Sequence, residues 1–130
     1  MATTHIVGLR TTLATAVRDA IDGGVAAGKL VFRLAGTVAA PGAAAATLTL
    51  TDPCGTVATG VLTFSAIASD TNAAGNATAV ANATLQTSAD AVQLHCAVAA
   101  SGSDINMTGG LIIGAGDTVS CSSLTYTAPA

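Results

Sequence analysis

The chain has 130 residues and a formal net charge of -3; only 8% of its residues are charged, whereas 51% are apolar. This length is typical of one domain, and the charged fraction is far below the ~25% of ordinary globular proteins, so an isolated copy would expose an unusually neutral surface. The four basic residues form no patch that could neutralise phosphates, and the chain lacks the ~18 consecutive large apolar residues of a membrane helix. We therefore expect a single domain over residues 1–130, with protein partners and with neither nucleic acid nor membrane as a partner.

Residues 5–22 carry the one convincing helical pattern of the chain. We expect Thr3 or Thr4 to cap its first turn and Gly23-Gly24 to end it in a left-handed conformation. Apolar residues recur at spacings of three and four, which places them on one stripe of an amphipathic helix: Ile6, Leu9, Leu13, Val17 and Ile21.

After Gly28 the apolar period changes to two, which predicts short strands throughout a β-domain over residues 29–127. Glycine, proline and aspartate mark the turns between them, as in the loop 36–46 and the turn 52–55. The expected strands are the segment from residue 30 to 34, then 47–51, 61–68, 77–85, 91–99, a short apolar run at 111–113 and 118–127. In the last of these, a bulge near Ser122-Ser123 would keep both of its apolar pairs, Val119 with Cys121 and Leu124 with Tyr126, facing inward.

About seven short strands behind one N-terminal helix predict a mainly-β fold, either a β-sandwich or a flattened barrel. The helix is expected to pack on its side or end. The core has few large side chains to draw on: Leu30, Phe32, Leu48, Leu50, Leu62, Phe64, Leu94 and Leu124. Because such a core offers little hydrophobic stabilisation to a lone copy, we expect self-association, most simply as a trimer or a dimer.

The three cysteines do not form the framework of a disulfide-rich secreted domain, because an odd number leaves one thiol unpaired in any intramolecular scheme. We expect all three to be reduced. Cys96 and Cys121 lie in expected strands, where a free cysteine behaves as a small buried apolar residue, and Cys54 lies in a turn.

No pattern of reactive residues predicts an enzyme. His5 and His95 have no partner at a zinc-binding spacing, and His95 and Cys96 are adjacent in a strand, so they point to opposite faces and cannot act together. The seven acidic residues are all aspartate and lie mostly beside turn formers, as Asp52, Asp70 and Asp117 do, which is typical of turn caps. We expect no catalytic, cofactor-binding or metal-binding residue and no cofactor.

The order of segments resembles a family of small structural proteins of tailed phages and prophages. The segments that carry the resemblance are AIDGGVAAGKL at 20–30, TLTLTDPCG at 47–55, GVLTFSAIASDTNAAGNATA at 60–79, SGSDINM at 101–107 and AGDTVSCSSLTYT at 115–127. The resemblance implies a component of the virion without enzymatic activity, assembled in the cytoplasm of the bacterial host.

Within that family the small size of the chain favours a capsid decoration, or cement, protein that binds the lattice of the major capsid protein, where many repeated contacts give avidity. A tail-tube or tail-completion subunit is the alternative; it would need a long loop that reaches the next subunit, and only residues 36–46 or 68–77 could supply one. A host-binding or glycan-binding β-sandwich module is a further alternative, which the scarcity of aromatic residues disfavours.

Overall fold

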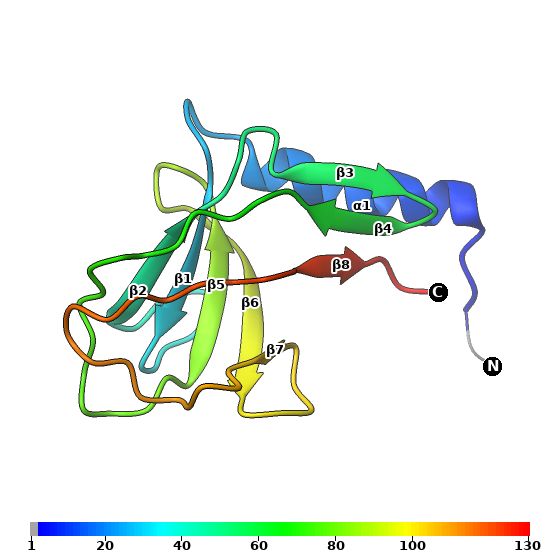
Figure 1. Ribbon diagram of the computed structural model, residues 1–130. Coiled ribbons are helices and arrows are strands. Elements are labelled where there is room, and N and C mark those ends of the chain that lie inside the picture. The colour runs from blue at the N-terminus through cyan, green and yellow to red at the C-terminus, as the bar shows by residue number, and fades with distance from the viewer. Residues whose placement is uncertain (1–2) are drawn as a thin grey trace.

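The computed structural model describes residues 3–130 and contains one helix and eight strands in two sheets (Figure 1). The chain is mainly β, and its curled sheets form a flattened barrel or sandwich with the helix at the N-terminal side, as predicted. No helix within this range is long and apolar enough to cross a membrane. The elements are α1 (Val7–Ile21), β1 (Lys29–Arg33), β2 (Ala44–Thr49), β3 (Gly55–Ala58), β4 (Val61–Phe64), β5 (Asn82–Gln86), β6 (Val92–Ala99), β7 (Ile105–Asn106) and β8 (Thr125–Thr127).

Five strands form the larger sheet in the order β2-β1-β5-β6-β7. All neighbours are antiparallel except β6 and β7, which run parallel. The register aligns a row of leucines across one face: Leu30 lies between Leu48 and Leu85, and Leu85 in turn pairs with Leu94. This row is the inner face of the sheet, as the period of two in the sequence predicts.

The smaller sheet, in the order β3-β4-β8, carries α1 and projects to one side of the larger sheet (Figure 1). The turn between β3 and β4 consists of Thr59 and Gly60, which both have a positive φ, of 49° and 80°. The backbone N–H of Gly60 donates a hydrogen bond of 3.0 Å to the hydroxyl of Thr11. The tip of this hairpin is therefore fixed to the first half of the helix.

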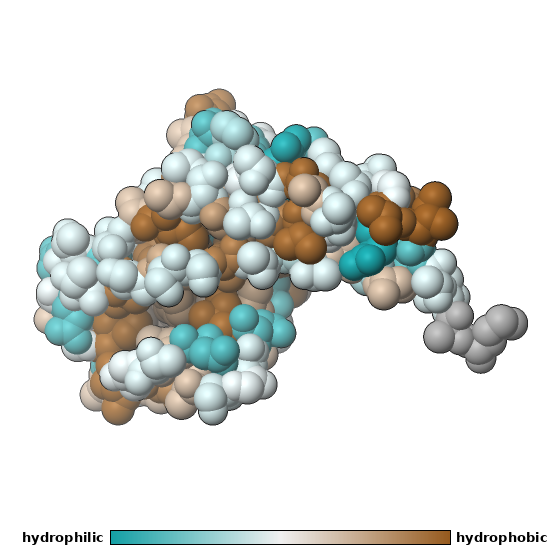
Figure 2. All heavy atoms as spheres, turned by 45° about the vertical axis from the view of Figure 1, so that its right-hand side comes forward, coloured by the Kyte–Doolittle hydropathy of each residue, from teal (hydrophilic) through white to brown (hydrophobic). Residues whose placement is uncertain are grey.

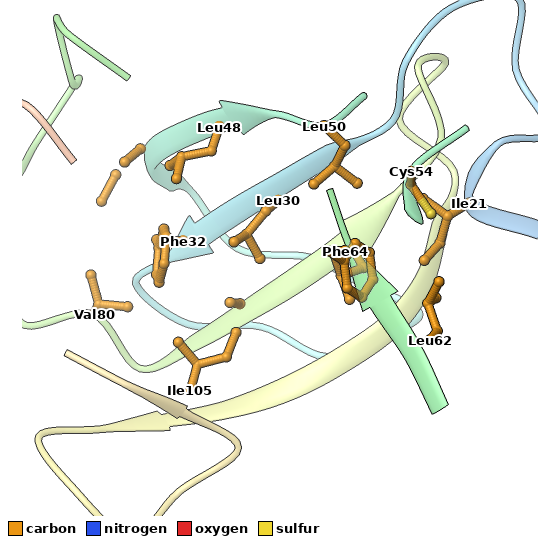
Figure 3. Packing of buried hydrophobic residues seen from close by; sticks show 14 of the residues in the cluster. Ile21, Leu30, Phe32, Leu48, Leu50, Cys54, Leu62, Phe64, Val80 and Ile105 are labelled. Carbon is orange, nitrogen blue, oxygen red and sulfur yellow. The ribbon is translucent and has the colours of Figure 1, made fainter. Parts of the chain in front are cut away.

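The core lies between the inner face of the larger sheet, the hairpin β3-β4 and the end of α1 (Figure 3). Of the eight predicted core residues, six are buried, whereas Leu94 and Leu124 are half-buried. Small side chains fill much of the remaining space, so that neighbouring elements come close together. The buried alanines of the core are Ala14, Ala45, Ala46, Ala73, Ala83 and Ala128.

Only the C-terminal half of α1 reaches this core. Ile21 is fully buried and Leu13 and Val17 are half-buried, but Leu9 is 44% exposed. The predicted apolar stripe is therefore correct toward the end of the helix and wrong at its beginning, because the helix extends past the core of the larger sheet (Figure 1). Ala14, which the stripe did not include, is also fully buried.

The predicted helix ends are wrong. The helix begins at Val7, with Ile6 at the N-cap position and no side-chain cap, so neither Thr3 nor Thr4 serves as one. At the other end the two glycines, Gly23 and Gly24, do not adopt a left-handed conformation. Gly24 is instead required by a close approach, because an added Cβ would overlap the side-chain oxygen of Ser88.

Several strand boundaries differ from those predicted. β5 begins only at Asn82, so residues 77–81 lie outside the sheet, and β4 ends at Phe64, so Ala66 is exposed instead of facing the core. The short strand expected at 111–113 does not form. β3 and β7 were not predicted; β7 lies inside the turn-rich segment 101–110 and is held by parallel pairing with β6. Short strands of this kind depend on distant partners and leave little periodicity in the sequence.

The predicted last strand, 118–127, is divided. Val119 forms an isolated bridge with Asp70, the chain then runs without ladder partners, and pairing resumes in β8. The apolar side chains of both expected pairs are half-buried against the core, as predicted, although an irregular segment with a bend at Ser122, and not a bulged strand, places them there. We call residues 117–124 the strap.

The end of α1 is tied to the turn before β3 by a side-chain contact. The carboxylate of Asp22, at the C-cap position, accepts the backbone N–H of Cys54 through both oxygens, at 3.0 and 3.1 Å. Hydrogen bonds to a charged acceptor are among the stronger ones in proteins. This contact fixes the helix against the beginning of the smaller sheet.

Replacing Asp22 with alanine should lower the free energy of unfolding by about 1–3 kcal/mol, because the Cys54 amide then loses its acceptor in a part-buried position. Asp22→Asn retains one acceptor oxygen, so its free energy of unfolding should fall by less than half as much as that of Asp22→Ala. Urea denaturation monitored by circular dichroism measures both changes. Asp19→Ala is the matched control, because Asp19 lies on the exposed side of the same turn. If Asp19→Ala lowers the free energy of unfolding as much as Asp22→Ala does, the role given to the contact between Asp22 and Cys54 is contradicted.

Candidate functional site

A groove of about 510 Å³ opens beside β7, at the edge of the larger sheet. Residues 104–113 form one wall, and the strap crosses the other side. The strap is held at its ends, where Val119 exchanges two backbone hydrogen bonds with Asp70 and the carbonyl of Leu124 accepts the amide of Phe64. Between these points residues 120–123 form no backbone–backbone hydrogen bond, so strand pairing does not close the groove.

The charged groups of the groove are both acidic. Asp104 accepts the backbone N–H of Ala97 at 2.9 Å and Asp117 accepts that of Gly114 at 2.8 Å, in each case through Oδ2. No lysine, arginine or histidine lines the groove, and the exposed side chain of Ile112 adds an apolar wall. Asp117 is the turn cap that the sequence predicted, whereas the groove itself was not predicted, because it exists only once the strap lies opposite β7.

A second group of polar side chains, the outer polar cluster, lies on the face of the larger sheet opposite the core. At its centre the guanidinium of Arg33 donates three hydrogen bonds. Nε binds the hydroxyl of Thr84 at 3.0 Å, Nη1 the carbonyl of Gly42 at 2.7 Å and Nη2 the side-chain oxygen of Gln86 at 2.8 Å. The cluster consists of Lys29, Arg33, Thr84, Gln86 and Asp90.

The cluster extends from Gln86 to a carboxylate. The side-chain amide of Gln86 donates to Oδ1 of Asp90 at 2.9 Å, and the ammonium of Lys29 donates to the same oxygen at 2.8 Å. The hydrogen bond and the charge of Lys29 lower the pKa of Asp90, so this carboxylate stays ionised and acts as an acceptor. The members of the cluster therefore bind one another and do not present a reactive group to a substrate.

The histidines and cysteines are dispersed. His95 is exposed and Cys96 half-buried on opposite faces of β6, as predicted, and His5 lies with its Nδ1 3.2 Å from the carbonyl oxygen of Ala130. Across residues 3–130 no group of three or more histidine, cysteine or acidic side chains is placed to hold a metal ion.

The three thiols are free and differ in their surroundings. Burial, with the charge and hydrogen bond of Asp22, raises the pKa of the Cys54 thiol to about 12. Burial also raises the pKa of Cys96, to which the charge of Asp104 contributes, and that of Cys121. Because the thiolate is the reactive form, none of the three is an activated nucleophile.

Large apolar side chains are exposed at four separate places on the surface. One is the projecting end of α1, where hydrophobic atoms gather (Figure 2). The others are the loop after α1, the hairpin after β1 and the rim of the groove. The helix end carries Ile6, Val7 and Leu9, the loop after α1 carries Val25, the hairpin after β1 carries Val38, and the rim of the groove carries Ile112.

A scan against protein-family models found no match, and searches of the curated proteins and of the solved structures found none either. The function proposed below therefore depends on the residues of the chain, their geometry and the resemblance in segment order.

Arg33→Lys should lower the free energy of unfolding by about 1–3 kcal/mol, because a single ammonium cannot reach three acceptors that the planar guanidinium binds together. Arg18→Lys is the matched control, since Arg18 forms only a surface ion pair with Asp19, and such pairs contribute little. Thermal melts of both variants test the difference. Equal melting temperatures for the two variants would contradict the structural role of the outer polar cluster.

Iodoacetamide at pH 8 should modify Cys96 and Cys121 well before Cys54 in the folded protein. With a pKa of about 12, only ~1 in 10⁴ of the Cys54 thiols is ionised at that pH, and the side chain is fully buried. Mass spectrometry of peptides over time measures the three rates. In urea the rates should become similar, and early labelling of Cys54 in the folded protein would contradict its placement.

Proposed function

We propose that the chain is a non-enzymatic structural subunit of a tailed phage particle, specifically a capsid decoration protein that binds and stabilises the lattice of the major capsid protein. It is assembled in the cytoplasm of the bacterial host and resides in the virion. The proposal is supported by the resemblance in segment order and, above all, by the distribution of exposed apolar side chains.

That distribution is the observation that carries the proposal. A protein that binds one small ligand gathers its apolar contact surface in one concave site. Here large apolar side chains are exposed at four places, and Val25 and Val38 lie on separate loops, with exposures of 104% and 55%. Single exposed apolar side chains are common on protein surfaces, so their weight here comes from their combination with a surface that carries few charges. This combination suits a subunit with several neighbours, as in a lattice.

The internal bonding of the polar residues supports a non-enzymatic role. The most connected polar side chains, those of the outer polar cluster, are engaged with one another, and the thiols have raised pKa values. General acid–base or nucleophilic catalysis needs a group that is accessible and poised near the working pH.

The structure bears on the tail alternative through its two candidate loops. Both 36–46 and 68–77 lie against the body of the molecule: Arg33 binds the carbonyl of Gly42, and the amide of Gly75 donates to a carbonyl of β2 at 2.9 Å. A loop that reaches the next subunit of a tube would extend away from its own domain. This favours the decoration protein over the tail subunit.

The aromatic side chains bear on the glycan-binding alternative. Phe32 and Phe64 are buried and Tyr126 is half-buried, so no aromatic ring is displayed as a platform for a sugar. The outer surface instead displays mostly threonine, alanine and serine. This too favours a protein partner.

Purified protein should bind emptied heads saturably, at hundreds of copies per head, and should not bind purified tails. The double variant Val25→Asp/Val38→Asp should bind heads at least tenfold more weakly, because carboxylates replace apolar contacts that the lattice covers. Co-sedimentation with labelled protein measures the affinity, and the melting temperature checks that the variants fold. Ala100→Asp adds charge at an exposed residue that belongs to none of the four places and serves as the control.

If the protein does not bind heads but saturates tails at a copy number that is a multiple of the subunits in one ring, the tail subunit replaces the proposal. Clear and saturable binding on a glycan array, again without binding to heads, would replace it with a host-binding module. Unchanged affinity of the double variant would exclude the two loops from the lattice contact.

A further inference from the structure

The projecting end of the molecule is not covered by any part of residues 3–130. It consists of Ile6, Val7, Leu9 and Arg10, at the start of α1 beyond the larger sheet (Figure 1). Ile6 is 77% exposed and Val7 53%. Hydrophobic atoms gather at this end of the surface (Figure 2).

Arg10 is the one basic residue, in the part of the chain that the structure describes, whose side chain has no polar partner. Arg18 and Lys29 each form an ion pair, and Arg33 donates three hydrogen bonds. The Arg10 side chain lies along Gly60, and its Nε is buried without a hydrogen-bond partner. The first turn of the helix contains no acidic residue, so no carboxylate of this turn pairs with Arg10.

The groove has the complementary character. Its charged residues, Asp104 and Asp117, each use one carboxylate oxygen to accept a backbone amide and have no basic partner. The side chain of Ile112, 62% exposed, forms part of the groove, and Phe32 lines it from the core side. At about 510 Å³ the groove is large enough to receive several side chains.

We infer that the projecting end of one copy of this chain docks in the groove of a second copy, with Arg10 of the first paired with Asp104 and Asp117 of the second. The second copy is the occupant because the charges match. Among the described residues, the one lysine or arginine without a polar partner lies at the projecting end, and the groove contains carboxylates without a basic partner. The apolar side chains of the two surfaces are covered in the same contact.

The two surfaces are different, so the contact is head-to-tail. A contact of this kind leaves a free projecting end and a free groove at the two ends of every open complex. It therefore propagates into a filament or closes into a ring. It does not involve Val25 or Val38, so it is independent of the proposed lattice contact. A charged contact of this kind should weaken as salt rises.

Charge exchange between two variants tests the contact in solution without capsids. Arg10→Asp places a carboxylate opposite an acidic groove, and Asp104→Arg/Asp117→Arg places arginines opposite Arg10, so each variant alone should associate at least tenfold more weakly than the wild type. In an equimolar mixture both junctions again join opposite charges, and association should return. Sedimentation velocity from 10 to 200 µM protein, at low and high salt, measures this, and thermal melts confirm that each variant is folded.

Asp104 and Asp117 also accept backbone amides, so replacing them with arginine could disturb the fold. A second, neutral variant separates this effect from the loss of charge. Asp104→Asn/Asp117→Asn retains an acceptor at both positions and should still weaken association and reduce its salt dependence. A wild type that stays monomeric at 200 µM, or folded variants that associate like the wild type, would overturn the inference. So would a mixture that fails to associate, and in each of these cases binding of the monomer to heads would leave the proposed function intact.

Discussion

Strand β5 is buried on both faces, and the arrangement of the elements around it follows from that constraint. Its inward side chains, Ala83 and Leu85, complete the leucine row of the core. Its outward side chains are polar and equally inaccessible to water, and an unpaired polar group in such a place costs about 1–3 kcal/mol. Arg33 supplies donors to Thr84 and Gln86 and at the same time holds the hairpin after β1 through Gly42, whereas the side-chain oxygen of Asn82 has no hydrogen-bond partner among the described residues. The cluster that most resembles a reactive site is thus a part of the fold.

The small side chains of the core explain why the beginning of α1 remains exposed. Alanines allow sheet and helix to approach closely, but they bury little area, and each large apolar side chain that does reach the core contributes only ~1.5–3 kcal/mol. The core covers the end of α1 and leaves its beginning bare, so that Leu9 is exposed on the same stripe on which Ile21 is buried. An apolar surface is therefore a direct consequence of a core too small to cover the helix that it anchors.

Sequence patterns predicted those features that depend on local periodicity. The fold class, the alternation in β6 and the opposite faces of His95 and Cys96 follow from a period of two, and the helix follows from the spacing of its apolar residues. The helix ends, β3 and β7 did not follow, because they are set by contacts with distant parts of the chain. The same holds for the candidate surfaces: Arg33 meets its partners some 50 residues away, and the groove exists only where the strap crosses β7. No pattern in the sequence indicates that Arg10 lacks a partner.

The position of β5 also sets an order of events during synthesis. β1 and β2 emerge from the ribosome early, yet the second neighbour of β1 is not available until Gln86 has been made. Until then the larger sheet consists at most of the β1-β2 ribbon, and a two-stranded ribbon is only marginally stable in water. The strap, which forms one side of the groove, is made still later. Folding of this chain is therefore completed from its C-terminal part, and the groove is the final feature to take shape.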